Sequence, residues 1–356
     1  MTRVLLAPDK FKGSLSAPGV AQALADGVHR ACPDAVVDLL PVADGGDGTV
    51  DAAVAGGFER VPVAVSGPTG DPVATSYARR GATAVVELAD ACGLARLPGG
   101  APAPMTATSR GLGEVMAATL DAGCRSLVVG IGGSASTDGG LGLLEALGAR
   151  ASDGLDLTGL HPALAGARIV VACDVDNPLT GPDGAAAVYA PQKGASPEQV
   201  AELDARLGRW ADLVAAATGT DRRDEPGAGA AGGVGFGLLA VLGAELRPGI
   251  DLVLDLLGFA ERVAGADLVV TGEGMLDRQS LRGKAPVGVA TAARRVGVPV
   301  AAVCGRTTLP DDELAAAGIS RAYALTDVEP DVSVCLREPA RLLVELGERL
   351  ARDVLG

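Results

Sequence analysis

The chain has 356 residues, which is enough to bury a large core and, at the usual domain size, to form two domains. Hydrophobic residues make up 48% of it and charged residues 21%, a balance that excludes intrinsic disorder. Aromatic residues make up only 2% and the formal net charge is -14, so we expect no binding to nucleic acids or to anionic membranes.

Targeting signals and redox or zinc chemistry are also not expected. No export signal is visible at the N-terminus, which predicts a cytoplasmic protein. The uncharged stretch 226–244 approaches membrane-spanning length, but its first half is mostly Gly and Ala and favours a loop leading into a buried helix. The six cysteines form no CxxC pair, and the only histidines are His29 and His161, so a histidine triad or a zinc site is excluded.

Short apolar runs alternate with helical patterns along the chain. The runs, each suited to a buried parallel strand, cover 4–8, 84–88, 126–133, 169–174, 267–274, 298–305 and 322–327. The helical patterns cover 19–31, 111–123, 142–149, 198–218, 285–297 and 337–355. This alternation predicts an α/β protein with parallel sheets covered by helices.

Acidic residues and glycines follow these strands, at the sheet edge where α/β proteins bind ligands. The segments are 9–14, Asp90, 132–134, Asp174 with Asp176, and 272–277, and the glycine-rich 43–49 lies between strands. The four lysines, Lys10, Lys12, Lys193 and Lys284, all fall in loop segments, while the arginines also decorate helical faces. A compact ammonium in a loop suits point-wise binding of an anion, and the alternative is that these loops are simply exposed to solvent.

Carboxylates, glycine-rich loops and loop lysines together favour phosphoryl transfer with magnesium. A Walker A motif is absent, because Gly283-Lys284 is followed by Ala285 and position 278 is Arg. The segment 130–135 nearly meets the dinucleotide fingerprint, but Asp174 lies too far downstream for the ribose contact. A nicotinamide-dependent oxidoreductase therefore stays only as an alternative.

Several long motifs occur in an order that resembles the type I glycerate kinase family: DKFKGSLSA, PVADGGDGT, GIGGSASTDGG, ACDVDNPLTGPDGA, PQKGA, PGAGAAGG and TGEGMLDRQSLRGKAPVGVA. The resemblance runs from Asp9 to about Ala290. It implies ATP- and Mg²⁺-dependent phosphorylation of D-glycerate, with 2-phosphoglycerate as the usual bacterial product. It also implies two α/β domains, with a flavodoxin-like domain (62–284) inserted into a domain formed by 1–61 and 285–356, and an active site in the cleft between them.

The resemblance implies a role for each matching position. Asp174 is the expected base, with Asp44 second, and Lys284 would neutralise the transferred phosphoryl group. Lys12, Ser14 and Arg110 would hold the carboxylate of glycerate. Glu273 and Asp277 are candidate metal ligands. The residues expected to contact nucleotide or phosphate are Gly132, Gly133, Ser134, Asp138 and Lys193.

Some alternatives stay open at this point. Asp138 would equally serve as the cap of a helix starting near Gly140, and Lys193 would equally decorate the surface. The glycines of 226–233 suit close packing at least as well as ligand contact. This sequence departs from the usual family pattern at Lys10, Asp47 and 136–137, where the family usually has Ser, Glu and Thr-Asn. A 3-phosphate product, another hydroxy acid as substrate, a non-catalytic binding protein, and a monomer or a homodimer all remain compatible with the sequence.

Overall fold

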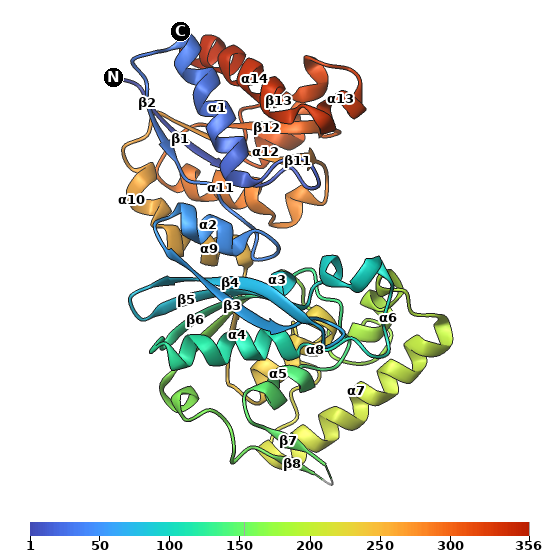
Figure 1. Ribbon diagram of the computed structural model, residues 1–356. Coiled ribbons are helices and arrows are strands. Elements are labelled where there is room, and N and C mark those ends of the chain that lie inside the picture. Colours follow the sequence, from blue (N-terminus) through green and yellow to red (C-terminus); the bar gives the residue numbers. More distant parts are fainter. Residues whose placement is uncertain (153, 356) are drawn as a thin grey trace. The chain divides into compact units, whose positions relative to one another are not determined.

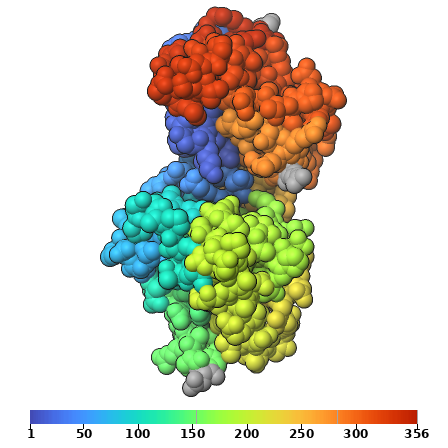
Figure 2. All heavy atoms as spheres, turned by 90° about the vertical axis from the view of Figure 1, so that its right-hand side faces the viewer, coloured from blue at the N-terminus to red at the C-terminus, as the bar shows by residue number. Residues whose placement is uncertain are grey.

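The computed structural model describes residues 1–152 and 154–355, which fold into two compact units. Unit 1 contains Met1–Asp44, Asp51–Gly57 and the residues from Ile250 onward, and unit 2 contains Gly45–Val50 and Phe58–Gly249. Both chain ends therefore belong to unit 1, as the blue and the orange-to-red residues of Figure 2 illustrate. The sequence placed the boundaries near residues 62 and 284. The second lies at Gly249 instead, because the strand after it pairs with the first strand of the chain.

Unit 1 is built from parallel strands and helices (Figure 1). Its strands are β1 (Arg3–Pro8), β2 (Val36–Leu39), β11 (Leu268–Leu276), β12 (Val300–Thr307) and β13 (Arg321–Ala324). Its helices are α1 (Ala17–Ala31), α10 (Phe259–Val263), α11 (Ala285–Arg295), α12 (Asp311–Ala316), α13 (Val332–Arg337) and α14 (Pro339–Val354). Helices α2 (Thr49–Ala55) and α9 (Gly249–Leu257) begin in unit 2 and continue in unit 1, and the short 3₁₀ turns are η5 (Ser280–Arg282) and η6 (Leu325–Asp327).

The strand order of unit 1, among the described residues, is β13-β12-β11-β1-β2. Numbered along the chain within this unit, that order is 2-1-3-4-5, which is the flavodoxin-like order. The sequence assigned this topology to the inserted middle domain, and the structure places it in the unit made from the chain ends. The order reverses between β1 and β11, so these two strands form the switch point at which such sheets bind ligands.

Alternating side chains of β1 pack on opposite faces of this sheet. Val4 and Leu6 belong to the core under α1 and α14, while Leu5 and Ala7 belong to the core under α9 and α11. Helices α1 and α14 lie in contact over much of their length (Figure 1). Their approach depends on Gly27, where a Cβ would lie 2.2 Å from the carbonyl oxygen of Val344.

Unit 2 contains the remaining elements. Its strands are β3 (Glu59–Ser66), β4 (Pro72–Arg80), β5 (Thr83–Glu87), β6 (Ser126–Gly130), β7 (Arg150–Ala151), β8 (Leu155–Asp156), β9 (Arg168–Ala172) and β10 (Glu245–Arg247). Its helices are α3 (Leu88–Cys92), α4 (Arg110–Asp121), α5 (Leu141–Ala146), α6 (Ala185–Tyr189), α7 (Pro197–Thr218) and α8 (Ala230–Ala240). The 3₁₀ turns are η1 (Leu94–Arg96), η2 (Pro98–Gly100), η3 (Pro162–Gly166) and η4 (Pro191–Lys193).

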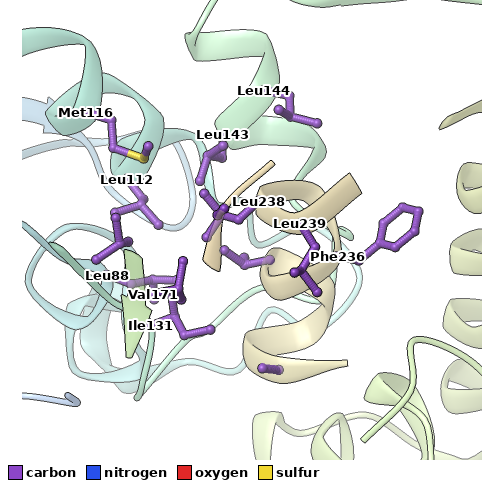
Figure 3. Packing of buried hydrophobic residues seen from close by; sticks show 14 of the residues in the cluster. Leu88, Leu112, Met116, Ile131, Leu143, Leu144, Val171, Phe236, Leu238 and Leu239 are labelled. Atoms are coloured by element: carbon purple, nitrogen blue, oxygen red, sulfur yellow. The ribbon is translucent and has the colours of Figure 1, made fainter. Parts of the chain in front are cut away.

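The main sheet of unit 2 has the order β10-β9-β6-β5-β4-β3 in the described part of the chain. Strands β5, β6, β9 and β10 are parallel neighbours, whereas β3 and β4 form an antiparallel hairpin at one edge. The sequence predicted β5, β6 and β9 and missed β10 and the hairpin. Figure 3 shows the core on one face of this sheet, where Leu88, Leu112, Ile131 and Val171 converge.

The α/β class is confirmed, and so are several local predictions. Helix α7 begins after Ser196, whose side chain and that of Gln199 form a reciprocal capping box. The stretch 226–244 forms a loop followed by the buried helix α8. Within residues 1–152 and 154–355, every helix is too short or too polar to cross a membrane.

Candidate active site

Two carboxylates meet at the switch point of the unit 1 sheet. Asp9 follows β1 directly, and its amide donates to the carbonyl oxygen of Gly272 on β11, at 2.8 Å. Glu273 is the next residue of β11, so both carboxylates lie at the carboxyl end of neighbouring parallel strands. The segment leading to Asp44 reaches the same edge, because the amide of Val42 donates to the carbonyl oxygen of Pro8.

Burial raises the pKa values of these two carboxyl groups, so they are weaker acids than usual. Asp9 is 7% exposed, and desolvation raises its pKa from 3.8 to about 7, although the charge of Lys10 acts in the opposite direction. The negative charges of Asp44 and Glu273 add to the rise. Desolvation also raises the pKa of Glu273, against a hydrogen bond from the side chain of Ser280, and its Oε1 is buried without a hydrogen-bond partner among the described residues. A carboxyl group that titrates near neutral pH is suited to proton transfer.

Lys284 faces Glu273 from the start of α11. Its Nζ lies 3.7 Å from Oε2 of Glu273, and the residue is the N-cap of the helix. A cation is disfavoured at a helix N-terminus, where the free N–H groups already present partial positive charge. Lysine and helix end together therefore make a site for an anion.

The other unit 1 candidates lie around this edge. The carboxylate of Asp277 accepts from the amides of Gln279 and Ser280, so it closes the turn before Lys284. The hydroxyl of Ser14 donates to the carbonyl oxygen of Phe11 at 3.1 Å, within the turn that follows β1. Lys12 is exposed in that turn, and its backbone lies beside Gly274 of β11.

In unit 2, the glycine-rich loop 131–138 follows the central strand β6. Gly133 is exposed and has a φ of +75°, which a side chain would strain. Ser134 is buried, and its hydroxyl accepts a hydrogen bond from Nζ of Lys193 at 2.8 Å. Lys193 is itself 3% exposed, so the reading of this residue as surface decoration is wrong.

Asp138 is engaged in holding two helix starts. Its Oδ2 accepts from the amide and hydroxyl of Ser109, at 2.7 and 2.8 Å, and from the amide of Gly142 at 3.3 Å. Its Oδ1 accepts from the amide of Gly140. These hydrogen bonds stabilise the N-termini of α4 and α5. Asp138 therefore has the helix-capping role that was one of the two alternatives left open by the sequence.

Arg110, at the start of α4, is engaged with two acidic side chains. Its guanidinium lies 3.1 Å from Glu114 and 3.8 Å from Glu145. The side chain is half exposed, so it remains accessible to a ligand.

Two acidic side chains of unit 2 accept hydrogen bonds from backbone amides near the positions where the chain passes from one unit to the other. Oδ1 of Asp174, an exposed residue after β9, accepts from the amide of Gly249 at 2.8 Å. The buried Glu87 accepts from the amides of Gly48 and Val50, at 3.0 and 3.1 Å. Desolvation raises the pKa of Glu87 to about 7.

Comparison with known proteins decides the family. The family model described as the glycerate kinase family matches residues 4–355. The chain belongs to this family. It is therefore an enzyme, a kinase of glycerate, and the predicted resemblance is confirmed.

Individual members of the glycerate kinase family match over most of the chain. A glycerate kinase from Bacillus subtilis is 42% identical over 99% of this chain and 96% of its own length. A glycerate 2-kinase from Escherichia coli is 43% identical over 86% of each chain. The crystal structure of a Salmonella typhimurium protein provisionally assigned as glycerate kinase 2 superposes with a TM-score of 0.87 at 39% identity, covering 99% of this chain and 98% of that one.

The alternative of a dinucleotide-binding loop does not fit this glycerate kinase. A dinucleotide fingerprint joins its strand directly to a helix, whose N-terminus holds the pyrophosphate. Here β6 ends at Gly130 and α5 begins only at Leu141. The glycines of 226–233 also have a packing role, since a Cβ on Gly232 would lie 2.1 Å from the carbonyl oxygen of Ser136.

Two acidic residues, Asp9 of unit 1 and Glu87 of unit 2, were not assigned a role from sequence. In the sequence, Asp9 was noted only as one of the residues that follow a strand. Its position beside β11, a second strand that ends in acidic residues, is what distinguishes it. Glu87 interrupts an apolar run, and a charged residue inside a buried strand is itself a signal of special bonding.

A magnesium ion fits the donors of unit 1 in part. No cluster of three or more His, Cys, Asp or Glu side chains that would hold a metal occurs in residues 1–152 and 154–355. Magnesium in kinases needs only one or two carboxylates, because phosphate oxygens and water complete its shell. Glu273 fits, since its Oε1 finds no hydrogen-bond partner among the residues that the structure describes, whereas the carboxylate of Asp277 already accepts hydrogen bonds within a turn.

Proposed function

We propose that this enzyme transfers the γ-phosphoryl group of ATP to the 2-hydroxyl of D-glycerate, with Mg²⁺, and releases 2-phosphoglycerate and ADP. The observation that carries the choice of hydroxyl is the 43% identity, over 86% of the chain, to a relative named glycerate 2-kinase. The family supports the use of glycerate and ATP.

The proposed reaction centre is the switch point of the unit 1 sheet. Lys284 and the N-terminus of α11 would neutralise charge on the transferred phosphoryl group, as phosphoryl transfer requires. Glu273 would hold the magnesium ion, which supplies further neutralisation of the phosphate oxygens when bound. Asp44 contributes negative charge to the same group of carboxylates.

Two carboxylates compete for the role of base. Asp174 is the choice from sequence, and its exposed carboxylate accepts the amide of Gly249. Asp9 is the better match in acidity, because its pKa of about 7 lets it accept the proton of the 2-hydroxyl at physiological pH and release it afterwards. We therefore propose Asp9 as the base, with Asp174 as the alternative.

Binding of the rest of each substrate is assigned to exposed loops. Lys12, Ser14 and Arg110 are proposed to bind the carboxylate of glycerate. The tip of the loop, at the half-buried Gly132 and the exposed Gly133, is proposed to bind ATP phosphates through its backbone amides, because these glycines follow a parallel strand and have no side chain.

The test is to incubate the purified protein with ATP, Mg²⁺ and D-glycerate, following ADP release and the product by ³¹P NMR. A new resonance of a phosphate on the carbon-2 oxygen supports the proposal. A 3-phosphate would overturn the choice of hydroxyl and keep the enzyme class. Turnover with a panel of other small hydroxy acids, and none with glycerate, would overturn the substrate.

A further inference from the structure

A buried ammonium group lies beneath the glycine-rich loop of unit 2. Nζ of Lys193 donates to the hydroxyl of Ser134 at 2.8 Å and to the carbonyl oxygen of Ser136. Both acceptors belong to loop 131–138, while Lys193 itself comes from η4, more than fifty residues further along the chain. The buried side of the loop is therefore held by a charged group from another element.

The exposed side of the same loop is the part proposed to bind ATP. Gly133 is exposed and Gly132 is half-buried, whereas the residues from Ser134 to Thr137 are buried. Lys193 is 3% exposed, and the described hydrogen bonds of its ammonium all go to that buried part. Its ammonium is thus placed to set the shape of the loop from below.

Backbone contacts hold the loop at several points, including Ala135, whose amide donates to the carbonyl oxygen of Cys92 at 3.2 Å, and Lys193 adds the bonds to the hydroxyl of Ser134 and the carbonyl oxygen of Ser136. The carbonyl oxygen of Gly133 accepts from the amide of Leu94 at 2.9 Å, and the amide of Gly139 donates to the carbonyl oxygen of Gly232 at 3.0 Å. Within residues 1–152 and 154–355 the buried hydroxyls of Ser136 and Thr137 have no hydrogen-bond partner, so they add no contact that holds the loop.

We propose that Lys193 is a positioning residue for nucleotide binding, which holds Ser134 and Ser136 so that the tip at Gly132 and Gly133 keeps the shape that binds phosphate. The proposal rests on the function proposed above, and it assigns Lys193 a role without contact to the nucleotide. The sequence had placed this lysine among the residues that touch nucleotide or phosphate.

The first test replaces the ammonium by an apolar chain of similar length. In Lys193→Met we expect the KM for ATP to rise about tenfold or more, with the KM for glycerate unchanged and kcat at saturating ATP within about threefold. Arg209→Met, an exposed residue of α7 with the same loss of charge, is the control and should behave like the wild type. An unchanged KM for ATP in Lys193→Met would overturn the proposal.

Salt separates positioning from direct contact. A lysine that touches phosphate through solvent-accessible space loses influence as salt rises, whereas a buried brace does not. The ratio of variant to wild-type KM for ATP should therefore stay constant between low and high salt. A ratio that falls steeply with salt would mean that Lys193 binds the phosphate itself, and would overturn the positioning role.

A double-mutant cycle tests the route through Ser134. Ser134→Ala should raise the KM for ATP on its own and have little further effect in the Lys193→Met background, because both changes remove the same contact. Fully additive effects would show that Lys193 does not act through Ser134.

The protonation of Lys193 supplies an independent readout. Desolvation lowers its pKa from 10.5 to about 8, against the opposing charge of Asp138, while the Cys92 thiol that also faces it is neutral because burial raises its pKa to about 12. In the wild type the KM for ATP should rise as the pH passes from 7 to 9, since the ammonium then loses a proton. This rise should be absent from Lys193→Met, and its persistence there would contradict the proposal.

The single tryptophan of the chain gives a readout that does not depend on turnover. Nε1 of Trp210 donates to the carbonyl oxygen of Gly139, just after the loop, at 3.0 Å. Titration with ATP, followed by Trp210 emission and by calorimetry, should give a weaker Kd for Lys193→Met and an unchanged one for Arg209→Met. If the wild type binds ATP but does not phosphorylate glycerate, the proposed function fails while the role of Lys193 is still tested.

Discussion

Nζ of Lys284 lies 3.7 Å from a carboxylate oxygen of Glu273, where the N-terminus of α11 meets the carboxyl edge of the unit 1 sheet. The other oxygen of that carboxylate is buried and has no hydrogen-bond partner in the described part of the chain. This arrangement leaves a cation and an unsatisfied acceptor side by side at the topological switch point. It is the combination expected where a phosphate and a metal ion bind together.

Lys284→Met should lower kcat by about 10²–10³-fold while changing the free energy of unfolding by no more than about 1 kcal/mol. The reason is that its ion pair is partly exposed and weak, whereas charge neutralisation matters in the transition state. Steady-state kinetics and urea unfolding check both values. The control is Arg278→Met, which breaks the exposed ion pair with Glu313 and should keep full activity. Equal effects of the two variants would remove Lys284 from the reaction.

Asp9→Asn should lose most activity and gain stability at alkaline pH. Because the folded pKa of about 7 exceeds the ordinary value of 3.8, the folded state holds a proton that the unfolded state has released between these pH values. Stability is therefore lost as the pH rises from about 4 to 7, and Asn avoids a penalty on the order of 1–4 kcal/mol at pH 8. Thermal unfolding of both proteins at pH 5 and pH 8 measures the difference, which should shrink at pH 5.

The pH profile of kcat/KM identifies the base. If Asp9 accepts the proton, the wild type should show an acidic limb near pH 7, and Asp174→Asn should retain that limb with only a modest loss of rate. A loss of activity in Asp174→Asn that exceeds the loss in Asp9→Asn would return the role to Asp174.

Glu87→Ala should destabilise the protein by about 1–3 kcal/mol for each amide left without an acceptor, those of Gly48 and Val50. Glu87→Gln retains one acceptor oxygen and should cost less. Chemical denaturation measures the series, with Glu59→Ala, an exposed change on β3, as a control near the wild-type value. A neutral Glu87→Ala would mean that water satisfies both amides.

Gly232→Ala should raise the KM for ATP and destabilise unit 2, because the new Cβ would lie 2.1 Å from the carbonyl oxygen of Ser136. Gly243→Ala is a matched control: its φ of +63° resembles the +71° of Gly232, but a Cβ there meets no atom within 4 Å. Strain of positive φ, on the order of 1–2 kcal/mol, is common to both, so the difference between the variants measures the collision. Kinetics and thermal unfolding of the pair give that difference, and identical behaviour would contradict it.

The sequence predicted the α/β class and the edge where carboxylates gather, since a rule about strand ends needs only local patterns. Asp9 and Glu273 both follow from that rule. Their adjacency did not, because β1 and β11 are separated by the whole of unit 2 and nothing local records which strands pair. For the same reason the flavodoxin-like order was assigned to the wrong unit.

Burial was the other quantity that local patterns left undetermined. Lys193 precedes a helix start and has a surface-like context in sequence, and only the packing of η4 under the loop buries it. The hairpin of β3 and β4 was missed because its strands are partly exposed and carry charged and small polar residues. Such strands lack the continuous apolar runs by which the buried parallel strands were recognised.

The pairing of β1 with β11 also sets the order in which the chain can fold during synthesis. Residues of unit 2 are contiguous except for 45–50 and all precede Ile250, so that unit can fold while the last hundred or so residues are still on the ribosome. Strand β1 is made first, yet it gains β11 as a neighbour only after residue 268 has emerged. The earliest strand of the protein, which carries Asp9 at its end, is thus among the last to be enclosed.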